Sequence, residues 1–166
     1  MEFLTQIFNG TTLAILGAAI AAALAGIGSA RGVGIVGESA SGLLSEDPTK
    51  FGQALVLQAL PGTQGIYGFI TAFLILQRSG IIGNNANLSI KQGVFYLMVA
   101  LPIAFGGFFS GIAQGRVAAS GINLIAKRPK ELVKAIVSAA LVETYAILAL
   151  LVSLLPIFMV DISALA

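Results

Sequence analysis

Glu143 is the one ionisable side chain inside the long apolar stretches of this sequence, in a stretch that covers residues 135–160. Such a group is costly in a bilayer, so it marks a functional site by default. One carboxylate neutralises one monovalent cation, which points to binding of Na⁺ or of a proton. The sequence has no Cys and no His, which excludes thiolate metal sites and His-based acid–base chemistry.

Oxygen-bearing groups share one face of the stretch 51–77. A spacing of i, i+3, i+4 and i+7 puts four residues on the same side of a helix: Leu60, Thr63, Gln64 and Tyr67. Pro61 has no N–H to donate to the carbonyl four residues earlier, so the helix is loosened there and a carbonyl is freed. This face therefore offers a hydroxyl, a phenol, a carboxamide and a backbone carbonyl.

Helix geometry predicts one depth for Gln64, Gln114 and Glu143. Gln114 and Glu143 lie about 14 residues before and after a turn at residues 128–129, or roughly 21 Å at 1.5 Å per residue. Gln64 lies about 16 residues after the turn at residues 47–48. Such an all-oxygen set suits a hard cation, and we favour Na⁺ over the alternative that each polar group only joins neighbouring helices.

A proton is the rival cargo at the same site. It needs only Glu143 and an apolar pocket, and Thr63, Gln64 and Gln114 can also hydrogen-bond a protonated carboxyl. The extra oxygens favour Na⁺ because a proton does not require them.

The composition indicates a membrane protein. Hydrophobic residues make up 57% and charged residues 10%, whereas soluble domains carry about 25% charged residues. This excludes a soluble enzyme and a disordered chain, and a net charge of +2 without a clustered basic face argues against a nucleic-acid partner. Four windows exceed the roughly 20 residues of a transmembrane helix, and their continuity favours helices over a barrel: residues 3–30, 51–77, 92–115 and 135–160.

We therefore predict an all-α membrane protein with four transmembrane helices in a single membrane domain, residues 1–166. The first window has no basic n-region and is too long for a signal peptide, so we expect it to be retained. Seven of the nine Lys and Arg residues fall between helices 1 and 2 or 3 and 4, which predicts that these two loops are cytoplasmic in the cell membrane and both termini external. Arg31 and Arg116 are expected to snorkel, or to pair with Glu38 or with lipid headgroups.

An internal repeat divides the chain into two helical hairpins, residues 1–78 and 91–166. Residues 26–31 (GIGSAR) match residues 111–116 (GIAQGR), and the turns 46–50 and 127–131 also correspond. Helices 1 and 3 are rich in Gly and Ala, which permits close backbone approach, so we expect them inside an assembly with helices 2 and 4 facing lipid. The run 32–37 fits GxGxxG, but it lacks the preceding strand of a dinucleotide site, so helix packing explains it better.

The chain resembles the proteolipid (rotor-ring) subunit of V-type rotary ATPases over essentially its whole length. The resemblance rests on the duplicated hairpins, the Gly/Ala-rich first helices, residues 60–68 (LPGTQGIYG) and residues 141–145 (LVETY), and the former string looks like the sodium-transporting bacterial branch. It implies a homo-oligomeric ring with helices 1 and 3 inside and 2 and 4 outside. It also implies a static membrane subunit with an essential arginine, and a central-stalk subunit leading to a cytoplasmic ATP-hydrolysing head.

The resemblance also implies roles for individual residues. Tyr67 would hydrogen-bond the carboxylate, and Na⁺ would be held by Glu143, Gln64, Thr63, Gln114 and the backbone carbonyl of Leu60. The chain has no P-loop, so we expect a non-catalytic subunit without an organic cofactor. The alternative of another class, a small four-helix exporter or pore-forming proteolipid, fits less well, because the chain has no Trp and its first and third helices carry Gly and Ala instead of a polar face.

Overall fold

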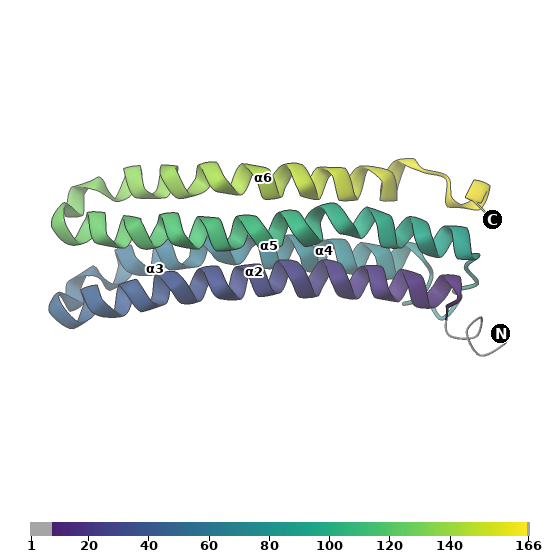
Figure 1. The fold of residues 1–166 in the computed structure, drawn as a ribbon, viewed down its shortest axis with the longest axis horizontal. Coiled ribbons are helices and arrows are strands. Elements are labelled where there is room, and N and C mark those ends of the chain that lie inside the picture. The colour runs from purple at the N-terminus through teal and green to yellow at the C-terminus, as the bar shows by residue number, and fades with distance from the viewer. Residues whose placement is uncertain (1–7, 166) are drawn as a thin grey trace.

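The computed structural model describes residues 8–165, and this part of the chain is helical with no strand. Its long helices alternate in direction along the chain (Figure 1): α2 (Gly10–Glu46), α3 (Phe51–Ala59) continued by α4 (Thr63–Arg78), α5 (Ile90–Lys127) and α6 (Leu132–Met159). Four helical segments of this part are long and apolar enough to cross a membrane, as the sequence predicted. Residues 3–7 of the first predicted window lie outside the described residues.

Both hairpin turns lie at one end of the bundle, and the C-terminal segment lies at the other end with the connection between α4 and α5 (Figure 1). The turns are the 3₁₀ segments η1 (Pro48–Lys50) and η3 (Pro129–Glu131), each with Pro at its start. Proline ends the preceding helix because its ring restricts the residue before it. The C-terminal η4 (Ile162–Leu165) is tied to the start of α5, where Gln92 donates to the Ile162 carbonyl at 2.9 Å.

The first turn is also tied to the second hairpin. Thr49 donates to Asp47 Oδ1 through its hydroxyl at 2.5 Å and its N–H at 3.1 Å. These hydrogen bonds hold the pKa of the Asp47 carboxyl below its usual range. Lys50 Nζ lies 3.4 Å from Asp47 and 3.5 Å from the carbonyl of Ile125 near the end of α5. The hydrogen bond from Lys50 to Ile125 therefore connects the two hairpins at this end of the bundle.

Helices α2 and α5 are much longer than the charge-free windows inside them. They continue through residues 31–46 and 116–127, which carry charged side chains, and stop only before the proline turns. At 1.5 Å per residue, the extensions project roughly 18–24 Å beyond the apolar windows. The charges therefore mark a polar environment around the helix and not the end of the helix.

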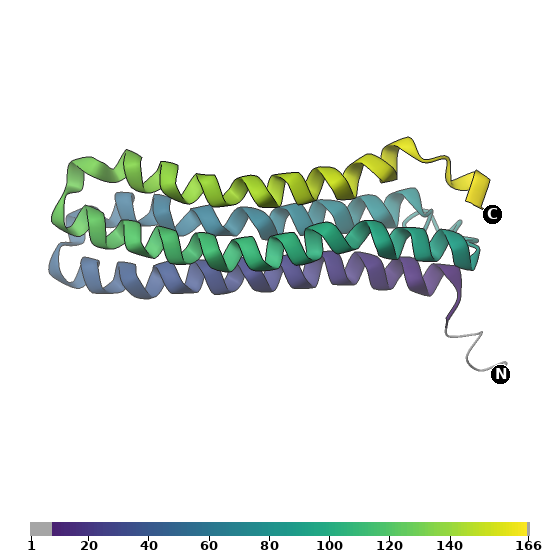
Figure 2. The ribbon, with the colours of Figure 1, turned by 45° about the horizontal axis from the view of Figure 1, so that its top comes forward.

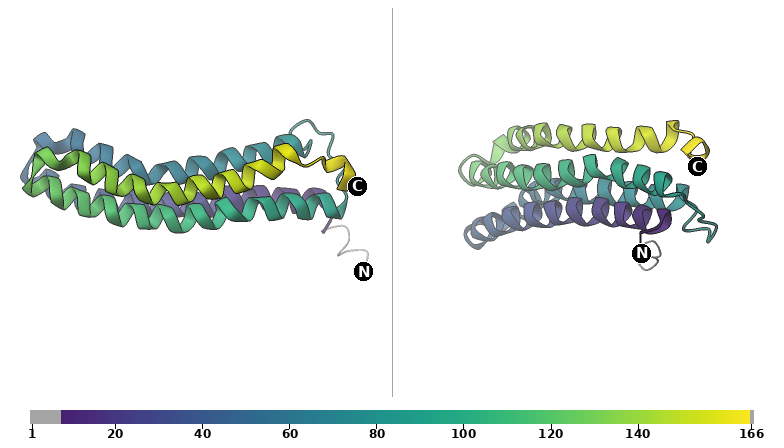
Figure 3. Two further views of the ribbon diagram at one scale, coloured as in Figure 1. Left: turned by 90° about the horizontal axis from the view of Figure 1, so that it is seen from above. Right: turned by 45° about the vertical axis from the view of Figure 1, so that its right-hand side comes forward.

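Glycines bring α2 and α5 into backbone contact along their length. A Cβ added to Gly28 would lie 2.5 Å from both Cα and the carbonyl oxygen of Phe108, and one added to Gly111 would lie 2.8 Å from the Gly28 carbonyl carbon. Only a residue without a side chain fits such a contact. The two small-residue helices thus pack directly on each other, while α4 lies against α2 and α6 against α5 (Figures 2 and 3).

Helix α6 has an open apolar surface. It leaves large apolar side chains exposed over several turns, among them Leu141, Leu148, Leu151 and Leu155. In water such a surface would be unfavourable, but in a bilayer it is matched by lipid or by another apolar chain.

We expect Gly28→Ala to destabilise the protein, because the new methyl group meets backbone atoms of α5 that cannot turn away. Overpacking of this kind costs about 1–3 kcal/mol, so the thermal midpoint of the detergent-solubilised protein falls. Gly34→Ala on the same helix is the control, because nothing lies within 4 Å of its added Cβ. Equal midpoints for the two variants would contradict the backbone contact.

Candidate ion-binding site

A break in the second membrane-spanning segment presents the first group of oxygens. Between α3 and α4, residues Leu60–Gly62 form the 3₁₀ segment η2, which contains Pro61. The carbonyl of Leu60 accepts from the N–H of Thr63, three residues on, and from the Thr63 hydroxyl at 3.1 Å. Because a 3₁₀ turn bonds i to i+3, this carbonyl and the Thr63 side chain are held together on one side of the break.

Gln64 follows the break, and its polar side chain points into the bundle. Its side chain is fully buried. Its Oε1 lies 3.5 Å from the Thr63 hydroxyl, and its Nε2 donates to Gln114 Oε1 on α5 at 2.5 Å. A buried amide is stable only when such partners are present, so this pair fixes the side chains of both glutamines.

Gln114 links this pair to the carboxylate. It is fully buried, and its Nε2 donates to the Ala139 carbonyl at 3.2 Å and to Glu143 Oε2 at 3.4 Å. Both acceptors lie on α6. One amide on α5 therefore bridges α4 and α6 at a single level of the bundle.

Glu143 completes the network from α6. Its Oε1 accepts from the Tyr67 hydroxyl at 2.6 Å, and its side chain is half-buried beside α4 and α5. The hydrogen bonds thus connect Tyr67, Glu143, Gln114 and Gln64 in one chain across three helices. The structure brings together the residues that the sequence placed at a common depth.

The donor set is rich in oxygen and carries one charge. A carboxylate, two carboxamide oxygens, one hydroxyl and one backbone carbonyl are the ligand types of a hard cation. Among residues 8–165, no three Asp, Glu, His or Cys side chains gather where they could hold a metal ion. The single carboxylate of Glu143 therefore balances one positive charge, as a monovalent ion or a proton provides.

Sequence reasoning missed one contact at this level. Ser29 of α2 is buried, and its Oγ accepts from the N–H of Gly65 at 2.7 Å. A signal was present in the repeat, because aligning residues 26–31 with 111–116 puts Ser29 opposite Gln114. The repeat indicates equivalent positions, but it does not say which neighbouring helix the Ser29 hydroxyl meets.

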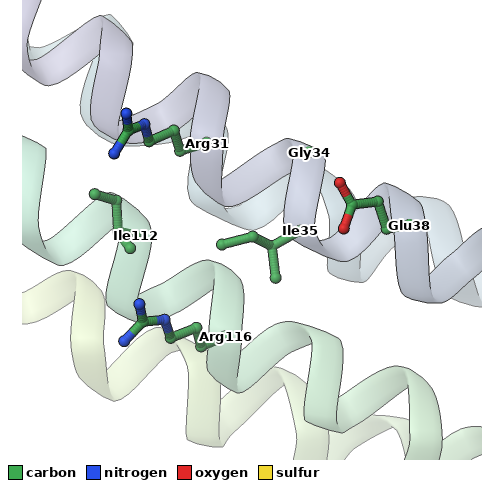
Figure 4. A pocket seen from close by; sticks show the side chains of 6 residues that line it. All are labelled: Arg31, Gly34, Ile35, Glu38, Ile112 and Arg116. Atoms are coloured by element: carbon green, nitrogen blue, oxygen red, sulfur yellow. The ribbon is translucent and has the colours of Figure 1, made fainter.

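Arg31 and Arg116 lie elsewhere. They point to the same side from α2 and α5 and line a shallow pocket with Glu38 further along α2 (Figure 4). The ion pairs that the described residues form are Lys50–Asp47 and Lys134–Glu131, so the structure does not form the expected pair of either arginine with Glu38. Neither arginine forms an ion pair with Glu143.

Comparison with known proteins identifies both halves of the chain. Residues 16–75 and residues 97–155 each match the sequence profile of the ATP synthase C subunit family. The chain is 52% identical over 155 residues to the V-type sodium ATPase subunit K of Enterococcus hirae, covering 93% of this chain and 96% of that protein. It is 41% identical over 144 residues to the A-type ATP synthase subunit K of Methanocaldococcus jannaschii, covering 86% of this chain and 60% of that protein. The double match confirms the predicted duplication.

We expect Tyr67→Phe to make Glu143 react several-fold faster with dicyclohexylcarbodiimide. The substitution removes the hydroxyl that holds Oε1 against α4, and a hydrogen bond to a charged group contributes about 1.5–3 kcal/mol. Labelling rates of the purified protein in Na⁺-free buffer measure the effect. Tyr145→Phe is the control, because Tyr145 is a neighbour on α6 whose side chain is exposed. The same rate in both variants would show that the Tyr67 hydrogen bond does not restrain the carboxylate.

Proposed function

The chain belongs to the ATP synthase C subunit family, and we propose that it is the ion-carrying rotor subunit of a V-type ATPase that transports Na⁺. The observation that carries the proposal is the buried oxygen network around one membrane carboxylate, Glu143. A relative that is 52% identical and is named as a V-type sodium ATPase subunit supports the choice of Na⁺.

In this proposal Na⁺ binds between the break in the second segment and the carboxylate on α6. Its ligands are the Leu60 carbonyl, the Thr63 hydroxyl, the two glutamine side chains and Glu143, while Tyr67 holds the carboxylate in place. Gln64 offers Oε1, because its Nε2 is engaged by Gln114. The Oε1 of Gln114 accepts from Gln64, but a carbonyl oxygen has two lone pairs, so it can also face a cation.

The transport step follows from charge. With Na⁺ bound, the site is neutral and can move past lipid, whereas a bare carboxylate at this depth costs at least a few kcal/mol. A static membrane subunit with an essential arginine would offer the carboxylate another positive partner, so the ion is released there. The chain itself is non-catalytic in this scheme, and a central-stalk subunit transmits rotation from the ATP-hydrolysing part of the complex.

The assembly we propose is a ring of identical chains. The glycine contacts between α2 and α5 support their place on the inner side, and the exposed apolar surface of α6 supports an outer place beside lipid, together with α4. The excess of Lys and Arg near the two hairpin turns supports a cytoplasmic position for both turns and an external position for the termini. One carboxylate per four helices gives one ion per chain, which suits a pump.

We expect Na⁺ to protect Glu143 from dicyclohexylcarbodiimide at fixed pH, whereas K⁺ at the same ionic strength does not. Glu143→Gln removes the labelling and identifies the reactive group. In Gln64→Leu, the Na⁺ concentration for half-protection rises at least about ten-fold, because the loss of even an outer-shell partner weakens a metal site by such a factor and Gln64 is a direct ligand in this proposal. Gln77→Leu, an exposed glutamine on the same helix, is the matched control. Labelling that depends on pH but not on Na⁺ would assign the proton as cargo instead.

We expect the detergent-extracted protein to have a mass many times that of one 17.0 kDa chain. Native mass spectrometry gives the number of chains directly, because a ring built from one type of chain must appear as an integral multiple. A monomer or dimer, found in a detergent in which the far-UV circular dichroism spectrum remains helical, would contradict the ring and favour a small exporter or pore-forming proteolipid.

A further inference from the structure

Ser29 makes a side-chain contact from α2 to the backbone of the ion-site segment. Its Oγ accepts from the N–H of Gly65 at 2.7 Å, and only 7% of the residue is exposed. Gly65 directly follows Gln64, and a Cβ added to it would lie 3.2 Å from both Cβ and Oγ of Ser29. The glycine therefore allows the backbone to come within hydrogen-bond reach of the hydroxyl.

This N–H lies at the start of α4, where the helix needs an outside acceptor. The first four N–H groups of an α-helix have no partner within it, and in a membrane an unsatisfied N–H is costly. The 3₁₀ segment Leu60–Gly62 already shifts the bonding there, since Thr63 bonds to the carbonyl three residues earlier. Ser29 accepts the bond from Gly65 and so anchors the far side of the break to α2.

The internal repeat places Ser29 in the same position as Gln114. Aligned on Arg31 and Arg116, the two halves each send one buried polar side chain from their first helix toward α4 at this level. Gln114 contacts the side chains of Gln64 and Glu143, whereas Ser29 contacts the backbone one residue beyond Gln64. The two equivalent positions of the repeat thus bond to adjacent residues of the same segment.

We infer that Ser29 is a positioning residue that keeps the 60–65 segment in the conformation in which the Leu60 carbonyl, the Thr63 hydroxyl and the Gln64 amide face Glu143. Through this segment it favours Na⁺, which needs those oxygens, over a proton, which needs only the carboxylate. The inference rests on the proposed Na⁺ site and adds to it a residue that touches no ion.

Ser153 offers a matched comparison in the same bundle. It is fully buried on α6, and its Oγ accepts from the N–H of Ile103, the residue after Pro102 of α5, at 3.1 Å. The bond is of the same kind, a serine hydroxyl that receives a backbone N–H beside a proline of a neighbouring helix. It involves none of the proposed ion ligands.

The test measures Na⁺ protection of Glu143 from dicyclohexylcarbodiimide in purified wild-type protein and in Ser29→Ala, Ser29→Thr and Ser153→Ala. In Ser29→Ala, the half-protecting Na⁺ concentration rises about ten-fold or more, as expected when a residue that supports metal ligands is removed. The labelling rate without Na⁺ stays near that of the wild type, because the carboxylate keeps its own partners. Ser29→Thr, which retains the hydroxyl, and Ser153→Ala stay close to the wild type.

If Ser29→Ala does not fold, Ser29→Cys keeps a side-chain atom beyond Cβ, slightly larger than the hydroxyl and a much weaker acceptor, and is expected to show the same rise. Wild-type protection with unchanged half-protecting concentrations in Ser29→Ala or Ser29→Cys would overturn the positioning role alone. An equal rise in Ser153→Ala would also overturn it, because the effect would then be a general loss of packing. Absence of Na⁺ protection in the wild-type protein would instead overturn the proposed Na⁺ site and this inference with it.

Discussion

A carboxylate within a bilayer must be hydrogen-bonded or neutralised, and Glu143 is the group on which this requirement falls. Two donors from different helices meet its oxygens, Tyr67 from α4 and Gln114 from α5. Gln114 in turn is fixed by Gln64 and by the carbonyl of Ala139. The hydrogen bonds that satisfy this one ionisable group therefore also join α4, α5 and α6 to one another.

Two features of the backbone make that arrangement possible. Glycines allow α2 and α5 to approach until their main chains touch, and the equivalent positions of the repeat, Ser29 and Gln114, both reach α4. At Leu60–Gly62 a 3₁₀ turn interrupts the helix and brings the Leu60 carbonyl and the Thr63 hydroxyl together. In a regular helix this carbonyl would instead accept from the N–H four residues on. Close packing and a local irregularity thus act together: the break groups the oxygens of Leu60, Thr63 and Gln64, and Gln114 connects Gln64 to the carboxylate.

Much of this was predictable because a helix has a fixed rise. Counting from the two turns predicted the common level of Gln64, Gln114 and Glu143, and periodicity predicted the shared face of Thr63 and Tyr67. The contact of Ser29 was not predicted, because it depends on the rotation of α2 about its axis, and the spacing of small residues does not fix that rotation. The same count assumed that the helices continue to the turns, and α2 and α5 do so, because charged residues indicate where the membrane ends and leave helix propensity intact.

The duplication explains why the site has one charge and several neutral oxygens. When the turn at residues 46–50 is aligned with the turn at residues 127–131, Gln64 of the first hairpin falls two residues from Glu143 of the second. With a shift of two residues, Gln64 therefore takes the place of Glu143. A second carboxylate there would repel the first across the Gln114 bridge, and two negative charges would require two cations or a proton between them. A glutamine keeps the oxygen and adds a donor, which the structure uses to bind Gln114. The second hairpin therefore contributes the charged Glu143 and the neutral Gln114 to this network. The first hairpin contributes the neutral oxygens of Leu60, Thr63 and Gln64 and the backbone contact of Gly65 with Ser29.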